Sequence, residues 1–325
     1  MRPDRWLRRW LSIREYRRVL DKVTAALLGG RHAEAESICE RALRLAEELY
    51  GVSDPEIVTP LYVLGSARLA QGRAEEALVT CRRALTIANE APAATDPALP
   101  RILEQIAAIF ERQGRLDKVA EILRKVLDGY DRMREPDPTE VAALANRLAL
   151  LLGRQGRHGE AGPLFKRALD LRERALGKSH PLVAEVLHNA ATYRHSDRSL
   201  AEAEGMFRRA LEIVTQPGDS STSLAALHGA ILHNLAVTCE EQGRPAEAVG
   251  LLEEALAMKE RLVGADHHEL RPTIVRLARL HAAARRFALA IPLYERALAI
   301  AKCESGVDYA VVSAIGAWLA AARAA

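Results

Sequence analysis

The sequence is poor in aromatic residues and in cysteine. Only 4% of its residues are aromatic although 49% are hydrophobic, so we expect helices that pack through Ala and Leu rather than a large aromatic core. The four cysteines, Cys39, Cys81, Cys239 and Cys303, form no C-x-x-C pair and show no zinc-ligand spacing. Nothing in this pattern indicates structural disulfides, and we expect Cys39 and Cys81 to be buried as small hydrophobic side chains.

Long hydrophobic segments and catalytic motifs are also missing. No apolar run approaches the length of a transmembrane helix, and the N-terminus has no continuous apolar segment of the secretory type. The sequence contains no phosphate-binding loop, no G-x-G-x-x-G, no H-E-x-x-H and no G-x-S-x-G. We therefore expect a cytoplasmic protein that is not an enzyme and uses no cofactor.

The charge is small and unevenly distributed. Residues 1–18 carry seven arginines against Asp4 and Glu15, a local charge of +5 within a total of +3, which leaves −2 for the rest. Most of the chain is therefore not basic, and its charge does not favour nucleic acid as a partner.

One sequence pattern recurs along nearly the whole chain. Its clearest copy, residues 141–184, reads as a helix, a tight Q-G-R turn, a second helix and a connection that contains His180 and Pro181. The small residue that opens the second helix recurs at steps of 42, 42, 42, 42, 45 and 42, as Ala35, Ala77, Val119, Ala161, Ala203, Ala248 and Ala290. A second small residue follows with the same steps, as Ala42, Ala84, Val126, Ala168, Ala210, Ala255 and Ala297.

Each copy has the pattern of two amphipathic helices. In the third copy Leu103, Ile106, Ala107 and Phe110 fall on one helical face. Gly156 lies between the helices of the fourth copy, where a left-handed backbone is least costly for glycine. A single helical hairpin cannot bury its apolar face, so the copies must stack on one another.

The segments NRLALLLGRQGRHGEAGPLFKRALDLRERALGKSHPLVAEVLHNAA and HNLAVTCEEQGRPAEAVGLLEEALAMKERLVG resemble the tetratricopeptide repeat family, in particular the 42-residue variety of kinesin light chains. The resemblance implies an all-α, right-handed superhelical solenoid of about seven helix-turn-helix repeats plus a C-terminal capping helix. It also implies a non-catalytic scaffold or adaptor that binds a peptide segment of another protein in its concave groove.

The repeats divide the chain into predicted segments. A basic extension containing tryptophan covers residues 1–11, and the solenoid covers residues 12–325. The repeats are placed at about 12–53, 54–95, 96–137, 138–179, 180–223, 224–265 and 266–307, with the capping helix at 308–325. Ser12 and Glu15 form a capping-box pattern at the start of the first repeat. The polar segment 216–223 holds the three-residue insertion and is expected to be a surface loop.

The N-terminal extension allows two interpretations. Trp6, Leu7, Trp10 and Leu11 would share one helical face, with arginines mostly on the other. The favoured interpretation is a short helix that folds back over the open end of the first repeat. The alternative is contact with an anionic membrane surface.

Two repeats lack the glycine of the turn. Arg198 stands at that place in the fifth repeat and Arg285 in the seventh. We expect either a left-handed arginine, at some cost in backbone energy, or a different turn.

The candidate binding residues lie on the first helices, which would line the concave side. They are Asn146, Arg147, His188, Asn189, His233, Asn234, Arg276 and Arg279. Asparagine side chains can bind the backbone of an extended peptide, and arginines can add charge-assisted hydrogen bonds to acidic side chains. The family resemblance implies main-chain contacts for Asn189 and Asn234 in particular. The alternative is that these polar side chains only solvate an exposed face.

Two other surfaces and one cluster remain as alternatives. Basic pairs recur on the second helices, as Arg82-Arg83, Arg124-Lys125, Lys166-Arg167 and Arg208-Arg209. They either form a solvated face paired with Glu76, Glu160 or Glu202, or an electrostatic surface for nucleic acid or an acidic protein. The Ala-rich helix 308–325 could act in assembly through self-association. His267 and His268 are adjacent, and we assign no metal to them.

Overall fold

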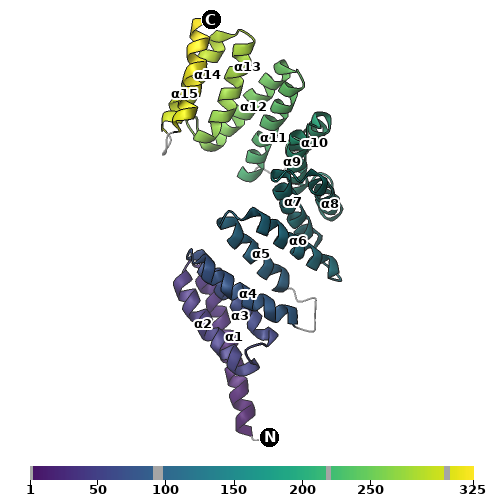
Figure 1. Cartoon of the computed structure of the whole chain (residues 1–325), viewed down its shortest axis with the longest axis vertical. Helices are drawn as coiled ribbons and strands as arrows, with labels where there is room; N and C mark the ends of the chain where they lie inside the picture. Colours follow the sequence, from purple (N-terminus) through teal and green to yellow (C-terminus); the bar gives the residue numbers. More distant parts are fainter. Residues whose placement is uncertain (1–2, 91–97, 217–220, 304–307) are drawn as a thin grey trace. The chain divides into compact units, whose positions relative to one another are not determined.

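The computed structural model describes residues 3–90, 98–216, 221–303 and 308–325, and every regular element in these ranges is helical (Figure 1). The α-helices are α1 (Pro3–Leu28), α2 (His32–Tyr50), α3 (Val58–Ala70), α4 (Ala74–Glu90), α5 (Ala98–Arg112), α6 (Leu116–Arg132), α7 (Pro138–Arg154), α8 (His158–Leu176), α9 (Pro181–Ser196), α10 (Leu200–Val214), α11 (Thr222–Glu241), α12 (Pro245–Val263), α13 (Arg271–Ala283), α14 (Phe287–Cys303) and α15 (Tyr309–Ala324). Two short 3₁₀ helices, η1 (Pro55–Ile57) and η2 (His268–Leu270), precede α3 and α13.

The order of elements is that of seven successive helix pairs followed by α15, which confirms the predicted all-α repeat architecture. Within the pairs, α1 packs on α2, α3 on α4, α5 on α6, α9 on α10, α11 on α12 and α13 on α14. Contacts divide the chain into two units, residues 1–152 and 153–325, which are described separately below. No helix among the described residues is long and apolar enough to cross a membrane.

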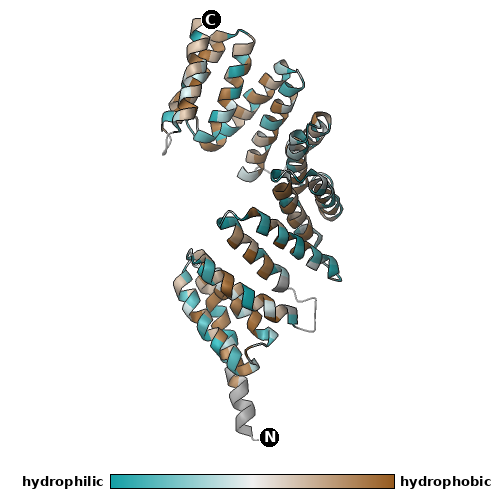
Figure 2. Cartoon of the chain, in the orientation of Figure 1, coloured by the Kyte–Doolittle hydropathy of each residue, from teal (hydrophilic) through white to brown (hydrophobic). Residues whose placement is uncertain are grey.

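The small residues of the repeat pattern are buried between the helices. Ala35 and Ala77 in the first unit, and Ala203 and Ala248 in the second, are completely buried. Cys39 and Cys81 are buried as predicted, Cys239 is buried as well, and Cys303 is exposed. Hydrophobic and hydrophilic residues interleave along the helices in Figure 2, as expected for helices that bury one face and expose the other.

The turns inside the pairs share one backbone conformation. Gly30, Gly72, Gly114, Gly156 and Gly243 all have φ between +68° and +80°. Arg198 and Arg285 adopt the same left-handed conformation, with φ of 62° and 57°. The closing backbone hydrogen bond is also kept, since the Arg286 amide donates to the His281 carbonyl at 2.8 Å. The fifth and seventh repeats therefore keep the left-handed turn and place a strained arginine in it, instead of adopting a different turn.

Several connections begin a helix with a side-chain cap. Asp54 accepts a hydrogen bond from the Glu56 amide at 3.0 Å, and His180 Nδ1 accepts one from the Leu182 amide at 3.1 Å. Asp308 caps α15 in the same manner. The cap of η2 is His267. Residues 217–220 of the expected surface loop 216–223 lie outside the described residues, and Thr222 and Ser223 belong to α11.

The capping box predicted at Ser12 is wrong. α1 is one continuous helix from Pro3 to Leu28, so Ser12 lies inside it and does not cap it. A separate short helix that folds back is excluded for the same reason. Residues 4–11 are mainly Arg, Leu and Trp and include no glycine or proline. The helix therefore continues through the capping-box pattern at Ser12. The side chains of residues 3–10 lie outside the described part, and the membrane alternative stays a prediction.

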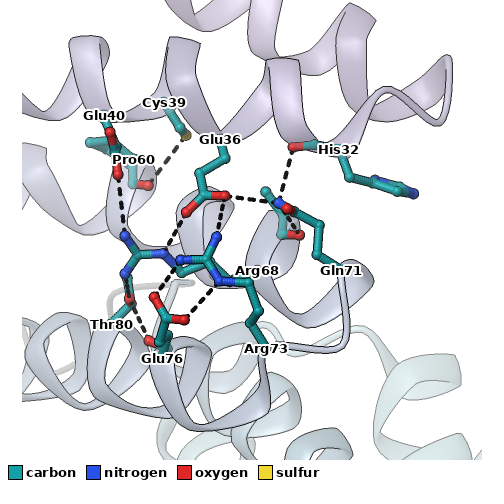
Figure 3. Close-up of polar contacts among 11 residues, drawn as sticks. His32, Glu36, Cys39, Glu40, Pro60, Arg68, Gln71, Arg73, Glu76 and Thr80 are labelled. Carbon is teal, nitrogen blue, oxygen red and sulfur yellow. Dashed lines mark hydrogen bonds and ion pairs between the residues drawn. The ribbon is translucent and has the colours of Figure 1, made fainter.

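A partly buried network of charges joins α2, α3 and α4 in the first unit (Figure 3). Arg68 Nε lies 3.0 Å from Glu36, and its two terminal nitrogens lie 2.9 Å from the Thr80 hydroxyl and 3.3 Å from Glu40. Glu36 also receives hydrogen bonds from Gln71 at 2.9 Å and from Arg73 at 2.6 Å. Burial alone would raise the pKa of Glu36, but the hydrogen bonds and the positive charges outweigh it and lower that pKa.

Candidate functional site

The first helices of the second unit, α9, α11, α13 and α15, carry six of the eight predicted binding residues. His188 and Asn189 lie on α9, His233 and Asn234 on α11, and Arg276 and Arg279 on α13. Their sequence spacing follows the repeat, so successive helices present them at neighbouring levels. The structure connects several of these side chains directly.

A polar contact links α9 to α11. Asn234 Nδ2 lies 3.0 Å from His188 Nε2 and 3.4 Å from the Thr192 hydroxyl. The His188 ring also contacts Phe207, with ring centroids 5.9 Å apart. Burial lowers the pKa of His188, although a hydrogen bond with Asn189 and the charge of Glu185 act in the opposite direction. A neutral His188 can accept the Asn234 amide hydrogen, which fixes the two helices relative to each other.

Two further contacts link α11 to α13. His233 Nδ1 lies 3.0 Å from the Thr273 hydroxyl, and Arg276 forms an ion pair with Glu240 at 2.7 Å. Burial, together with the positive charges of Lys259 and Arg276, lowers the pKa of His233 to about 4. His233 is thus neutral at physiological pH, and Arg276 is oriented by a carboxylate from the preceding first helix.

The other two predicted residues belong to the first unit. Asn146 on α7 is buried, with only 5% of its surface exposed. Arg147 lies 2.5 Å from Glu111 on α5, an ion pair with the same 36-residue spacing as that between Glu240 and Arg276. The structure therefore brings His233, Arg276 and Arg279 around one pocket but does not group Asn146 and Arg147 with them.

The pocket lies in the second unit and has a volume of about 290 Å³. It is lined by His233, Arg271, Pro272, Val275, Arg276, Arg279, Val311, Ala314, Ile315 and Trp318. The Arg279 guanidinium lies 5.4 Å from the centre of the Trp318 ring, a cation–π contact between α13 and α15. Trp318 also approaches Tyr294, with ring centroids 6.3 Å apart.

Sequence reasoning missed part of this pocket. It singled out neither Trp318 nor Arg271 as a binding residue. A signal was available in the sequence. Trp318 is an aromatic residue on α15, which corresponds to the first helix of a further repeat, and the repeat pattern places binding side chains on first helices. The lining contains three arginines and no acidic residue, so the pocket favours an anionic group.

The basic pairs on the second helices are largely neutralised. Arg83 pairs with Glu47 at 2.6 Å, and Lys125 pairs with Glu121 at 3.2 Å. In the second unit, Arg208 pairs with Glu204 and Glu247, and Arg209 pairs with Glu173. Two of the expected acidic partners pair with other arginines, Glu76 with Arg73 and Glu202 with Arg194. Longer arginine side chains reach across to the neighbouring repeat, which sequence proximity does not reveal.

His267, His268 and Glu269 present donor atoms that all lie within 4.8 Å of one another. These are three consecutive residues at the start of η2, and the His267 Nδ1 atom already faces the Glu269 amide at 3.4 Å as the helix cap. That contact accounts for the position of His267 without a metal ion, and we assign none to this cluster.

Comparison with known proteins identifies the repeat. The family model described as "Tetratricopeptide repeat" matches residues 23–79, 56–132, 140–216 and 227–302. Among solved structures, BtubC (BKLC) from P. vanneervenii is similar with a TM-score of 0.60 and 24% identity, over 72% of this chain and 92% of that one. A kinesin-light-chain protein with tetratricopeptide-like repeats from Podospora anserina has a TM-score of 0.54 and 17% identity, over 63% and 98%.

A tetratricopeptide repeat protein from Parabacteroides merdae has a TM-score of 0.56 and 16% identity, over 95% of this chain and 99% of that one. No curated protein matches the chain at a significant level. At these identities the likeness to solved structures concerns the fold alone.

Proposed function

The chain belongs to the tetratricopeptide repeat family, and from this premise we propose that it binds a peptide segment of a partner protein on the first helices of its second unit. Proteins of this family typically mediate protein–protein interactions, and the proposal involves no chemical reaction. It places the protein in the cytoplasm, in keeping with its free, mostly buried cysteines.

The observation that carries the proposal is the convergence of His233, Arg276 and Arg279 on one pocket. These residues were selected for their repeat positions, and the same positions line the pocket between α13 and α15. Contacts from α9 to α11 and from α11 to α13 hold the first helices in fixed register before any partner arrives. Such preorganisation reduces the entropy that binding must overcome.

The electrostatic alternative, binding of nucleic acid through the basic pairs, has weaker support. Arginines of these pairs already contact carboxylates from neighbouring helices, as Arg83 does with Glu47 and Arg209 with Glu173. An ion pair on the protein surface leaves little net field for phosphate groups. Assembly through the exposed, Ala-rich face of α15 stays a prediction, and light scattering at high protein concentration tests it.

The proposal can be tested with a side chain that fills the pocket. Ala314 lines it and is partly exposed, so we expect Ala314→Arg to fold normally and to block the pocket. Leu289 on α14 is 52% exposed and lies outside the pocket, so Leu289→Arg is the matched control. Crosslinked pull-downs from the native cell should lose a specific protein with Ala314→Arg and retain it with Leu289→Arg. Recovery of the same proteins with both variants would contradict the proposed site.

A further inference from the structure

The pocket between α13 and α15 has a polar side and an apolar side. Arg271, Arg276 and Arg279 supply the polar side. The apolar side consists of the aliphatic side chains Val275, Val311 and Ile315, the methyl group of Ala314 and the Trp318 ring. A ligand that satisfies both sides needs a negatively charged group next to an apolar group.

The three arginines differ in how strongly they are already neutralised. Arg276 is paired with Glu240, which orients its guanidinium and offsets part of its charge. Arg279 is exposed, and its contact within the described residues is with the face of Trp318 rather than with a carboxylate. A guanidinium stacked on an aromatic ring keeps its N–H groups, which lie in its own plane, directed outward. Arg279 is therefore the residue best prepared to receive a carboxylate in a two-pronged arrangement.

Trp318 supplies the apolar contact that accompanies this charge. It is 37% exposed although it lies on a helix that packs against α14, so a large part of the indole is available to a ligand. Tyr294 is near the ring and supports it from α14. Tryptophan and arginine together are typical of the residues that dominate binding energy at protein interfaces.

The size of the pocket limits what it accepts. A volume of about 290 Å³ is at the lower end for ligand sites, so it suits one or two side chains rather than a folded surface. A basic segment would place its charge against three arginines, and a purely apolar segment would offer no carboxylate to Arg279.

We infer that this pocket binds an acidic side chain of the partner segment, held by Arg279 and Arg276, together with an adjacent apolar side chain that contacts Trp318. The inference rests on the proposed function and adds to it the chemistry of the segment. It assigns Arg279 and Trp318 as the residues that select the partner, whereas the links among His188, Asn234, His233 and Thr273 only hold the helices in place.

Selection from a displayed library of random peptides on the immobilised full-length chain tests this assignment. We expect enrichment of sequences in which Asp or Glu stands within two positions of an apolar residue. A synthetic peptide of the enriched sequence should bind about tenfold or more weakly to Arg279→Gln, as expected for the loss of a charge-assisted hydrogen bond. Arg323→Gln, on α15 outside the pocket and paired with Glu295, is the matched control and should bind as the wild type does.

A second readout follows the pocket directly. In a chain with Trp6→Phe and Trp10→Phe, Trp318 is the sole tryptophan, and its emission should change on addition of the peptide. The same peptide with Asn or Gln replacing its acidic residue should lose both binding and the emission change. C-terminal amidation of the peptide should leave binding unchanged, because the inference assigns the anion to a side chain.

Three results would overturn the inference: enrichment of basic or uncharged sequences, no enrichment, or equal affinity for Arg279→Gln and the wild type. Loss of binding on amidation would reassign the anion to a chain terminus and would also contradict it. These failures are distinct from failure of the proposed function. If Ala314→Arg still abolishes capture of the native partner, the pocket binds a segment of other chemistry, and if it does not, the site itself is wrong.

Discussion

Arg198 and Arg285 each occupy a backbone conformation that five other turns give to glycine. A left-handed conformation costs an ordinary L-residue about 1–2 kcal/mol, because its Cβ approaches the following carbonyl oxygen. Arg198 recovers part of this through an ion pair with Glu241 at 3.2 Å. No comparable contact is found for Arg285 among the described residues, so Arg285 carries the clearer strain.

We predict that Arg285→Gly stabilises the protein by about 0.5–1 kcal/mol, the relief of strain less the added entropy of glycine in the unfolded chain. Gly243→Ala, at φ of 79°, is the converse substitution and should destabilise by about 1–2 kcal/mol. Urea unfolding followed by circular dichroism measures both. Destabilisation by Arg285→Gly would mean that the arginine side chain contributes more than its backbone costs.

His233 makes stability depend on pH. Its pKa is about 4 in the folded chain, whereas an unperturbed histidine has a pKa of about 6.5, so the unfolded chain takes up the proton first as the pH falls. The stability that a neutral His233 provides is complete above about pH 6.5 and is lost as the pH falls towards 4. His233→Gln cannot titrate, so its urea midpoint should fall less than that of the wild type over this range. Parallel pH profiles for the two proteins would contradict the assignment.

At the scale of helices, the network around Arg68 links α2, α3 and α4 in the first unit. Arg68 is 19% exposed and Glu36 is 12% exposed, so removal of the arginine takes one hydrogen-bonding partner and one positive charge from a mostly buried carboxylate that keeps Gln71 and Arg73. We predict that Arg68→Met destabilises the protein by about 2–3 kcal/mol, less than for a fully buried pair. Arg31→Met removes an exposed pair with Glu34 and should change stability by no more than about 0.5 kcal/mol. Equal effects of the two substitutions would contradict this account.

The sequence predicted the structure best at positions where a single residue type meets a structural requirement. Alanines such as Ala161 and Ala203 recur because helices approach closely there, and Gly156 recurs because its φ is positive, so helix pairs and turns could be predicted. Contacts between repeats could not be predicted equally well. The Asn234–His188 and Arg276–Glu240 contacts depend on which rotamers cross from one helix to the next, and sequence spacing does not determine that.

The N-terminal helix shows a second limit. A capping box at Ser12 is a local preference worth about 1 kcal/mol, and continuous helix-forming residues on both sides outweigh it. Trp318 shows a third limit, because covering a neighbouring repeat and lining a pocket require the same amphipathic pattern.

At the scale of the whole molecule, stability is distributed among neighbouring repeats, because each helix pair contacts mainly the pairs before and after it. A defect in one unit should therefore remain local. We predict that Arg68→Met accelerates amide hydrogen exchange in α2, α3 and α4 and leaves exchange in α11 to α14 unchanged. Uniform acceleration along the chain would show that the two units unfold together and would contradict this prediction.

The central claim is that the partner contacts the pocket between α13 and α15 of the second unit. Photo-crosslinking with a benzoylphenylalanine at position 272, where the exposed Pro272 lines the pocket, followed by mass spectrometry of the attached peptide, tests it most directly. The account predicts one partner segment that crosslinks from position 272 and not from position 289 on α14, and this segment should contain an acidic residue beside an apolar one. Crosslinks from position 289 alone, or the same products from both positions, would contradict it.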